Sequence, residues 1–470
     1  MDKEQLIHDA SMEILRDVGI KIRNSEAVAI YKNNGITVKD DIAFFSEGEI
    51  MRWLEKAPAI FTLYARNSEY DMELGTDKVH PSPAYGCAFM AERDGSRRPG
   101  TVQDYVNCVR LIQATPDYSI CGGILVQPND VPTETAPADM FYATLLNSDK
   151  ALFVATGKKG VVEALLRAGS EFFGGERAVV EKPRMITLVN TNSPLSLDGQ
   201  MLDCLMLFAR YGQPVILAPS AMLGTTAPLA IAGTLASGNA ENLAGIVLTQ
   251  MIRPGTPVVY GMQSTAMDMR SAQYACAAPE GTILQGFGAR MARFYKLPSR
   301  GGGSLTDAPL VNAQAGYESM MTLFSAYRNG INLVMEAGGV MAGVMATSYD
   351  KMLCDFEIIR MVKRCLTPFE VNEETLGLAD IREVGHDGEF LTTDYTLENF
   401  REVFTPGIAT RGSVDGTYFE ENLDREYVRL MEDFESRRPR LDGAEKKDIR
   451  TTLQRLTGID GGQLERVEAL

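Results

Sequence analysis

The chain offers few side chains suited to acid–base or metal chemistry. It has only three histidines, His8, His80 and His386, and its seven cysteines form no Cys-x-x-Cys pair. A catalytic zinc or iron site normally recruits imidazole, and the sequence contains no H-E-x-x-H motif and no Cys/His cluster. A Ser-His-Asp or Cys-His nucleophile would also require an imidazole base. We therefore expect no bound metal and a reaction that does not depend on histidine.

Polar and aromatic side chains at the ends of short apolar runs are better suited to holding a small ligand. Amides can bind its polar atoms and aromatic faces can cover its apolar parts. These candidates are Tyr85, Phe89, Asn190, Asn192, Tyr260, Gln263, Arg300 and Glu336. The competing interpretation for each aromatic residue is ordinary packing in the core. A buried Glu336 would require a cation or a proton, or it would turn towards an arginine such as Arg300.

Lysine chemistry has little support in the sequence. Lys158 and Lys159 follow an apolar run, but glycines flank them, and solvated lysines at a helix start are the simpler interpretation. A barrel enzyme of carbon–carbon chemistry would need a lysine or a metal where the substrate binds. This alternative is therefore disfavoured.

Eight short apolar stretches, most leading into a helix-like segment, must position the candidate residues. Continuous apolar runs of this length suit parallel strands that are covered on both faces. Strand followed by helix, repeated eight times, predicts an α/β fold, a TIM (β/α)8 barrel, with a doubly wound open sheet as the alternative. The predicted strands are Ala84–Met90, Ser119–Val126, Ala151–Thr156, Met185–Asn190, Pro214–Ala218, Pro257–Met262, Leu297–Gly302 and Ile331–Ala337.

The barrel would occupy residues 81–367 of the 470. Residues 1–80 and 368–470 then form N-terminal and C-terminal extensions, both mainly helical, which cap the barrel and build a subunit surface; we expect a homo-oligomer. Active sites of such barrels lie at the C-terminal ends of the strands. The candidate residues are expected to meet there.

Charge and cysteine content limit the partners and the compartment. The net charge of −16 disfavours nucleic acid or an anionic membrane as a partner. Seven cysteines without a pairing pattern indicate reduced thiols, and the first residues lack the basic and apolar regions of a signal peptide. We expect a cytoplasmic protein.

Several runs at the predicted turns resemble one known family. The chain resembles the trimethylamine methyltransferase family, specifically its members without pyrrolysine, over nearly its whole length. The runs that carry the resemblance are Tyr85-Gly86, Arg97-Arg98-Pro99, Asn192-Ser193-Pro194-Leu195, Gly224-Thr225-Thr226-Ala227-Pro228-Leu229, Asp268-Met269-Arg270-Ser271, Asn312-Ala313-Gln314-Ala315-Gly316-Tyr317-Glu318 and His386-Asp387-Gly388.

The resemblance implies a TIM-barrel methyltransferase that moves a methyl group from an amine to the Co(I) corrinoid of a separate partner protein. No cofactor would be tightly bound here, because the cobalamin belongs to that partner. In the founding members pyrrolysine engages trimethylamine, and its position falls at or near Gly343 in this sequence. Relatives without pyrrolysine act on quaternary amines such as glycine betaine, proline betaine or carnitine, which implies a substrate of that class.

A quaternary nitrogen suits the candidate residues, because it leaves as a neutral amine without a general acid. Its cation offers no hydrogen-bond donor, so aromatic faces and a carboxylate are appropriate contacts. We assign Tyr85, Phe89, Tyr260 and Glu336 to the cation. Asn190, Asn192, Gln263 or Arg300 would hold a substrate carboxylate.

Glu336 and Gly343 are the predicted catalytic positions. Gly343 would leave room for the corrinoid, although it equally suits a helix entry. A non-catalytic quaternary-amine binding or scaffold protein remains the alternative function.

Overall fold

The computed structural model describes residues 2–413 and 416–470, and an eight-stranded parallel sheet forms its centre. From the second strand to the eighth the strands pair in chain order, and the first strand pairs with the last, Leu333 opposite His80; among the described residues the first and second strands do not pair, so the barrel is nearly closed. They are β6 (His80–Pro81), β9 (Ile120–Gly122), β10 (Ala151–Phe153), β11 (Met185–Asn190), β13 (Val215–Ala218), β15 (Val258–Gly261), β18 (Ser299–Gly302) and β19 (Leu333–Met335). This order confirms the barrel and excludes the doubly wound sheet, whose strand order reverses partway.

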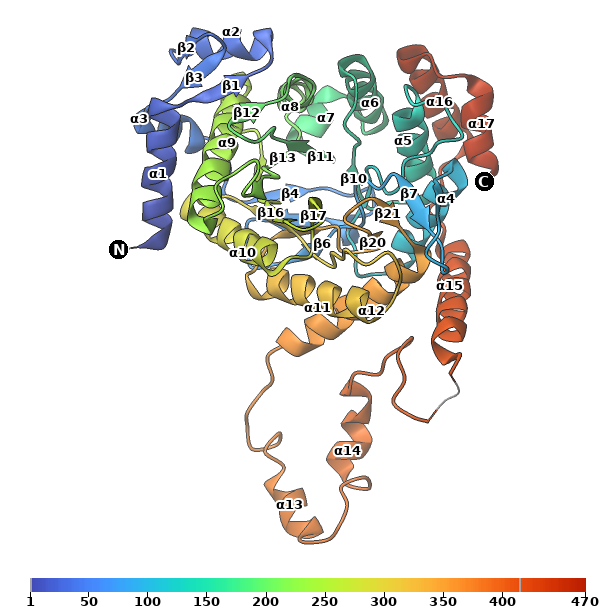
Figure 1. Cartoon of the computed structure of the whole chain (residues 1–470). Coiled ribbons are helices and arrows are strands. Elements are labelled where there is room, and N and C mark those ends of the chain that lie inside the picture. Colours follow the sequence, from blue (N-terminus) through green and yellow to red (C-terminus); the bar gives the residue numbers. More distant parts are fainter. Residues whose placement is uncertain (1, 414–415) are drawn as a thin grey trace.

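One helix after each strand forms the outer ring, which Figure 1 shows around the strands. The ring helices are α4 (Val102–Ala114), α5 (Ala136–Asn147), α6 (Lys159–Phe172), α8 (Gly199–Arg210), α9 (Ile231–Ile252), α10 (Pro279–Phe294), α11 (Ala313–Arg328) and α12 (Tyr349–Leu366). Among the described residues, no helix is long and apolar enough to cross a membrane.

The prediction for the first strand was wrong. The barrel strand is His80–Pro81, whereas the predicted stretch Ala84–Met90 leaves the barrel through Gly86, whose φ of 86° only glycine adopts freely. Its last residues start β7 (Phe89–Ala91), which pairs outside the barrel. Apolar character alone did not distinguish a barrel strand from a strand over the barrel's end.

Two small sheets stand at the C-terminal end of the barrel, which we call the mouth. One contains β14 (Met222–Leu223), β16 (Thr265–Asp268) and β17 (Gln273–Ala275). The other contains β7, β8 (Arg97–Pro99), β20 (Val340–Met341) and β21 (Ala346–Thr347). Both lie in front of the barrel in Figure 1, so the loops after strands β6, β13, β15 and β19 form structured walls around the mouth.

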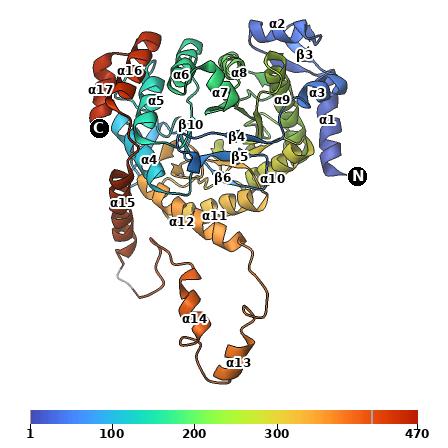
Figure 2. The same ribbon diagram turned by 180° about the vertical axis from the view of Figure 1, so that it is seen from behind.

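A hairpin closes the opposite end, which we call the base. Its strands β4 (Phe61–Leu63) and β5 (Met72–Leu74) lie across the barrel in Figure 2, which shows the molecule from behind. Side chains of the hairpin form one buried cluster with inward-facing residues of the barrel strands, such as Ile186 and Val259. The barrel interior is therefore filled with apolar side chains from the base upwards.

Extensions at both ends of the chain pack outside the helix ring. The N-terminal part is less purely helical than expected, since it adds strands to its three helices and covers α9 with α1 and α3. Its elements are α1 (Lys3–Asp17), β1 (Ile20–Ile22), α2 (Ser25–Asn33), β2 (Thr37–Lys39), β3 (Ile42–Phe44), α3 (Glu47–Leu54) and the short helix η1 (Ser68–Tyr70). Elsewhere, α7 (Glu176–Glu181) precedes β11, and β12 (Ser196–Leu197) pairs with β1.

The C-terminal part contains helices only. They are α13 (Leu378–Val384), α14 (Asp394–Asn399), η2 (Phe400–Glu402), α15 (Tyr418–Arg437), α16 (Gly443–Thr457) and α17 (Gly461–Ala469). The last three pack against the ring helices α4, α5 and α6. The segment with α13 and α14 instead projects away from the barrel in both views (Figures 1 and 2).

Candidate functional site

A buried ion pair lies at the mouth. Arg300 is in β18 and Glu336 directly follows β19, and the Nη2 of Arg300 donates to both carboxylate oxygens, at 2.6 and 2.8 Å. The Nη1 of Arg300 donates to the Oε1 of Gln263, which follows β15. Only 1% of Arg300 and 4% of Glu336 is exposed. Three neighbouring strands thus bring together three residues that the sequence analysis had selected separately.

The backbone explains how Glu336 reaches this position. Leu333 and Met335 point into the barrel, so regular alternation would turn Glu336 outwards. Its left-handed φ of 54° breaks the alternation, at a cost that the ion pair offsets. Gly302 makes room for the cluster, because a Cβ there would lie 3.2 Å from both Glu336 Oε2 and Gln263 Oε1.

Glu336 therefore pairs with Arg300, the arginine that the sequence analysis named as one possibility, rather than waiting for the cation of a ligand. Burial raises the pKa of Glu336, and the charge of Arg300 opposes that rise. Arg300 still has a buried Nε without a hydrogen-bond partner among the described residues. The mouth thus contains a buried ion pair without net charge and one buried donor that has no partner among the described residues.

Two tyrosines lie close enough to Glu336 for its charge to affect them. Burial, with the Glu336 carboxylate as a smaller cause, raises the pKa of Tyr85 to about 12. The Tyr85 hydroxyl is buried and makes no hydrogen bond of good geometry to a described residue, although Thr156 lies near enough to oppose the rise in its pKa; the Tyr85 ring lies 4.9 Å from the ring of Phe153. Tyr274, in β17, donates to the backbone oxygen of Gln263 at 3.1 Å, and burial likewise raises its pKa. The sequence analysis missed Tyr274, since it considered only residues that directly follow each strand.

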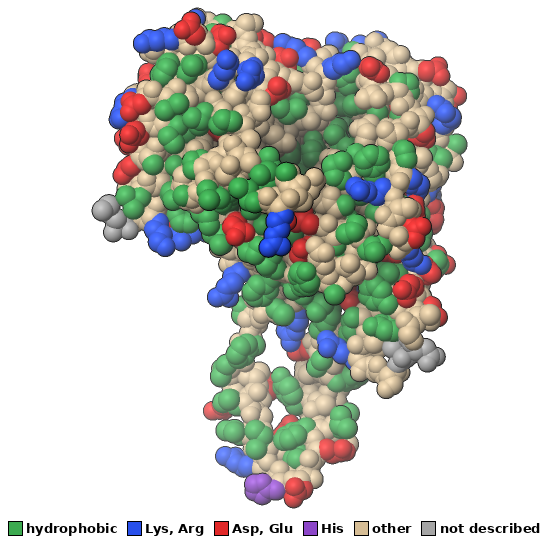
Figure 3. Space-filling model, viewed as in Figure 1, with side chains coloured by type: hydrophobic (Ala, Val, Ile, Leu, Met, Phe, Trp, Pro, Cys, Tyr) green, Lys and Arg blue, Asp and Glu red, His purple; other side chains and the backbone are tan. Residues whose placement is uncertain are grey.

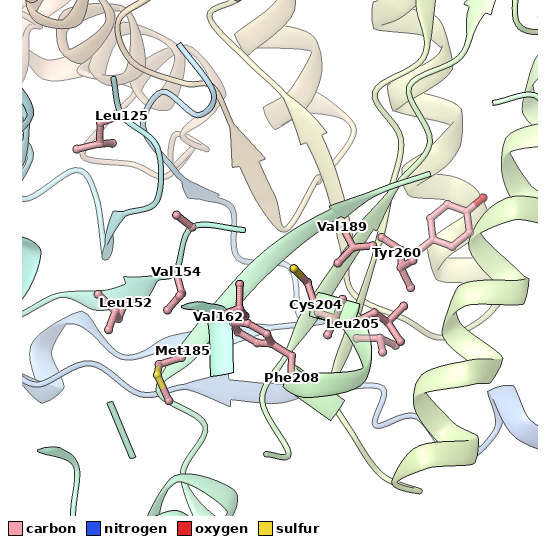
Figure 4. Close-up of a cluster of buried hydrophobic side chains, with 14 of the residues drawn as sticks. Leu125, Leu152, Val154, Val162, Met185, Val189, Cys204, Leu205, Phe208 and Tyr260 are labelled. Atoms are coloured by element: carbon pink, nitrogen blue, oxygen red, sulfur yellow. The ribbon is translucent and has the colours of Figure 1, made fainter. Parts of the chain in front are cut away.

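Tyr260 does not belong to this group. Its hydroxyl donates to the Oδ1 of Asn239 in α9 at 3.0 Å, and its ring lies 6.2 Å from that of Tyr295. Figure 4 shows its ring among the apolar side chains between the strands and the helix layer. Val259, the preceding residue, points into the barrel, so alternation turns Tyr260 outwards and the competing interpretation of core packing is correct here.

The remaining candidates lie around the mouth rather than beside Glu336. Asn190 ends β11 and Asn192 follows it; both are exposed, and their side chains make no hydrogen bond to the described residues. Phe89 packs in the small sheet against Met341 and Ala346. On this face Figure 3 shows a hollow near the centre, with mostly hydrophobic and uncharged side chains around it.

Gly343 lies in the turn between β20 and β21, not at a helix entry. Three successive residues, Ala342, Gly343 and Val344, have left-handed φ values of 50°, 65° and 72°. A Cβ on Gly343 would meet nothing closer than 3.4 Å, the backbone oxygen of Tyr274. A Cβ at this position would therefore be in ordinary van der Waals contact with Tyr274 and with Asp307, whose Oδ1 lies 3.5 Å away.

Two buried carboxylates that the sequence analysis did not select hold the mouth loops in place. Glu241, in α9, accepts hydrogen bonds from Thr191, from Ser193 Oγ at 2.8 Å and from the Leu195 N–H at 2.8 Å. No cationic side chain of the described residues pairs with it, and burial raises the pKa of Glu241. A carboxylate in the middle of an apolar helix was the available signal, because such a group must find donors.

Asp355, the second, joins the loops that follow β18 and β19. It accepts from Lys351 Nζ at 2.5 and 2.6 Å and from the Gly339 N–H at 2.7 Å, while Lys351 also donates to the Ser304 oxygen at 3.0 Å. Burial, opposed by Lys351, raises the pKa of Asp355 to about 6. The described residues contain no cluster of three or more His, Cys, Asp or Glu that could hold a metal ion.

Known proteins match the chain along most of its length. The family model described as trimethylamine methyltransferase matches residues 1–438. A glycine betaine methyltransferase of Desulfitobacterium hafniense (strain Y51) is 39% identical over 424 residues, covering 90% of this chain and 88% of that protein. An L-carnitine:corrinoid methyltransferase of Eubacterium limosum is 29% identical over 450 residues, covering 92% and 91%.

A solved structure supports the architecture. The monomethylamine methyltransferase of Methanosarcina barkeri superimposes with a TM-score of 0.51 at 11% sequence identity, covering 92% of this chain and 87% of that chain. At this identity the likeness concerns the fold alone. Together with the match to the family model, it leads to one assignment: the chain belongs to the trimethylamine methyltransferase family.

Proposed function

We propose that this protein transfers a methyl group from a quaternary amine of the betaine type to the Co(I) corrinoid of a partner protein. The relatives named for glycine betaine and carnitine support this substrate class, and so does a proline betaine:corrinoid methyltransferase of Eubacterium limosum, 30% identical over 385 residues. The observation that carries the proposal is the enclosed group of two tyrosines beside the neutralised Glu336–Arg300 pair, inside the mouth of a chain of this family.

The reaction needs alignment more than proton transfer. When the partner is bound, its Co(I) corrinoid would supply the electron pair that forms the new bond to the methyl carbon. The electron pair of the broken C–N bond stays on nitrogen, so the product is a neutral amine and no proton moves. The residues of this chain must bind the cation, exclude water and aim one methyl group at the opening.

Tyr85 and Tyr274 would surround the cation. A quaternary ammonium group cannot donate a hydrogen bond, whereas the faces of tyrosine rings attract it. Glu336 adds negative potential on the same side, although its pairing with Arg300 weakens that effect. In a betaine the carboxylate lies close to the nitrogen, so the free Tyr85 hydroxyl and the free Arg300 Nε could both donate to it. Asn190 and Asn192 are further donors at the rim.

The partner would dock on the rim of the mouth. Four large apolar side chains there are strongly exposed: Leu229 by 69%, Met269 by 68%, Tyr317 by 64% and Met345 by 47%. Leu229 and Met269 come together over Gly224, at 3.4 and 3.7 Å from the position of its missing Cβ. Exposed apolar patches of this kind mark protein contacts. The turn with Gly343 lies at the same end of the barrel, and the missing side chain there would let the corrinoid approach more closely.

A methylation assay tests the proposal. The purified protein is mixed with a reduced corrinoid protein and glycine betaine, proline betaine, carnitine or trimethylamine. We expect methylated cobalt and one equivalent of demethylated amine with at least one of the first three. Binding of a betaine without its demethylation would favour the non-catalytic alternative, and demethylation of trimethylamine alone would contradict the substrate class.

A further inference from the structure

The loop that follows β11 at the mouth turns its side chains alternately outwards and inwards. We call residues 190–195 the β11 loop. Every second residue of this loop is exposed and those between are half-buried: Asn190, Asn192 and Pro194 against Thr191, Ser193 and Leu195. The half-buried residues are the ones that donate hydrogen bonds to Glu241. One set of residues therefore holds the loop, and the other set is free to meet a ligand.

Strand β11 directs Asn190 into the mouth. Ile186 and Leu188 belong to the cluster inside the barrel, whereas Val189 belongs to the cluster between the strands and the helices, where Figure 4 shows it. Successive side chains of a strand point to opposite faces, so Asn190 continues the inward row. Because Asn190 is exposed, its amide lies in the open part of the mouth.

Glu241 holds the inner side of the β11 loop. Its Oε2 accepts from the hydroxyl groups of Thr191 and Ser193, at 2.8 Å for Ser193, and its Oε1 accepts from the Leu195 N–H at 2.8 Å. Only 1% of Glu241 is exposed, and no charged side chain of the described residues pairs with it. A buried carboxylate without a counter-charge is costly unless donors surround it. These contacts therefore fix the carboxylate and the loop together.

Backbone contacts support the far end of the β11 loop. The Asn192 N–H donates to the Ser196 oxygen at 2.8 Å, and the Lys21 N–H of β1 donates to the Leu195 oxygen at 2.9 Å. Leu195 has a left-handed φ of 48°, which costs free energy for a leucine. Since Glu241 accepts from the N–H of this same residue, the carboxylate helps to maintain the strained conformation.

We propose that Glu241 is a positioning residue, which fixes Asn190 and Asn192 as donors to the carboxylate of a betaine. This inference rests on the proposed function and names the group that prepares its substrate site. Glu241 itself would touch neither the substrate nor the corrinoid. Donors that are held in place before binding lose less freedom when the ligand arrives, so the affinity for the ligand is higher.

The role assigned to Glu241 depends on its hydrogen bonds and not on its charge. The amide of a glutamine could replace all three contacts: its oxygen would accept from the Leu195 N–H, and its NH2 group would donate to the hydroxyls of Thr191 and Ser193, which rotate to accept. A leucine could replace none of them and would leave three donors without a partner. Glu241→Gln and Glu241→Leu therefore form an informative pair of variants.

Titration calorimetry on the full-length protein tests the proposal with glycine betaine and with tetramethylammonium, a quaternary amine without a carboxylate. We expect Glu241→Leu to raise the Kd for glycine betaine about tenfold, a factor that corresponds to one hydrogen bond to a charged group. The Kd for tetramethylammonium should change by less than about twofold, because Asn190 and Asn192 do not bind it. Glu241→Gln should restore most of the lost affinity.

A double-mutant cycle shows whether Glu241 acts through the two asparagines. In the background Asn190→Ala/Asn192→Ala, Glu241→Leu should cause no further loss of affinity for glycine betaine, because the residues that it positions are already removed. Additive losses would contradict the proposal.

A matched control is Glu357→Leu. Glu357, midway along α12, is likewise a buried carboxylate with three donors, the backbone N–H groups of Gly407, Ile408 and Ala409, at 2.6 to 3.1 Å. These donors belong to the C-terminal part outside the helix ring. The variant should therefore bind glycine betaine with the affinity of the wild type.

The fold of the Glu241 variants is checked by circular dichroism. If Glu241→Leu does not fold, Ser193→Ala removes one donor from a half-buried position of the β11 loop and should raise the same Kd severalfold. Unchanged affinity in these variants, or an equal loss for both ligands, would overturn the proposal. An equal loss in Glu241→Gln and Glu241→Leu would also overturn it, because the effect would then come from the charge.

The same titrations separate this inference from the proposed function. A wild type that binds neither a betaine nor tetramethylammonium would overturn both. A wild type that binds a betaine without demethylating it would contradict the proposed function alone, because calorimetry measures the role of Glu241 in binding without any turnover.

Discussion

The two ends of the barrel differ in the side chains that close them: apolar ones at the base, and polar and charged ones at the mouth. The base is closed by the apolar hairpin β4–β5, and a buried lysine near it, Lys150, donates to the backbone oxygens of Ile112 and Thr115 at 2.6 Å each. The mouth instead contains the Glu336–Arg300 pair, a tyrosine hydroxyl without a partner among the described residues and six non-glycine residues with a left-handed φ, namely Leu195, Ala272, Ser304, Glu336, Ala342 and Val344. Stability is therefore concentrated at the base, whereas the mouth retains the polar groups and strain that binding requires.

Breaking the ion pair should have the largest effect. In Glu336→Gln the buried charge of Arg300 loses its compensation, which costs about 3–5 kcal/mol of unfolding free energy. We expect kcat/KM for methyl transfer to fall by about a hundredfold or more, equivalent to roughly 3 kcal/mol. Denaturant unfolding and the methylation assay measure the two effects.

The double variant Arg300→Met/Glu336→Leu separates a role of the ion pair in stability from a role in methyl transfer. Replacing a buried pair by apolar side chains of similar volume is often neutral, so most of the lost stability should return. Activity should not return if the pair serves the substrate. A fully active double variant would show that the pair is structural.

Truncating one buried side chain of the apolar hairpin should lower the stability of the fold and leave the rate of methyl transfer unchanged. Leu63→Ala removes a fully buried side chain from the base cluster and should cost about 2–5 kcal/mol. The control Ile60→Ala changes an exposed neighbour and should stay within about 0.5 kcal/mol. We expect kcat/KM to be unchanged in both, and a large kinetic effect of Leu63→Ala would contradict the division between base and mouth.

Lys150 should make stability at the base depend on pH. Burial lowers the pKa of Lys150 from 10.5 to about 7. Between these values the unfolded chain binds a proton that the folded chain does not, so the fold gains stability as pH rises, by up to about 1.4 kcal/mol per pH unit. Unfolding curves from pH 7.5 to 9.5 should show this gain for the wild type relative to Lys150→Met; parallel pH profiles would refute it.

Substitution of Tyr85 or Tyr260 by phenylalanine should have the smallest effects on stability and on KM. Tyr85→Phe removes a hydroxyl without a protein partner, so stability should change little while KM for a betaine rises severalfold. Tyr260→Phe breaks the bond to Asn239 and should cost about 0.5–1.5 kcal/mol without changing KM. The opposite pattern would place the substrate elsewhere.

Much of the fold could be predicted because parallel strands under helices leave a distinctive pattern. The other seven apolar stretches each contain a barrel strand, including the weakly apolar Leu297–Gly302. The prediction of the first strand was wrong, because His80–Pro81 is too short and too polar to stand out from the apolar residues that follow it. The closure of the base by the hairpin β4–β5 could not be predicted. The hairpin itself forms between neighbouring segments, but its burial depends on barrel strands that lie far away in the chain.

At the candidate site, the sequence by itself determined which residue types stand at the strand ends: Gln263, Arg300 and Glu336 among them, with no histidine nearby. Only the tertiary structure decided which of them meet. Alternation along a strand turned Tyr260 outwards, a left-handed φ at Glu336 turned its side chain inwards, and the hairpin that follows β15 folded back to bring Tyr274 to Gln263. These side-chain orientations depend on how whole segments pack in the folded protein, so the local sequence pattern does not predict them.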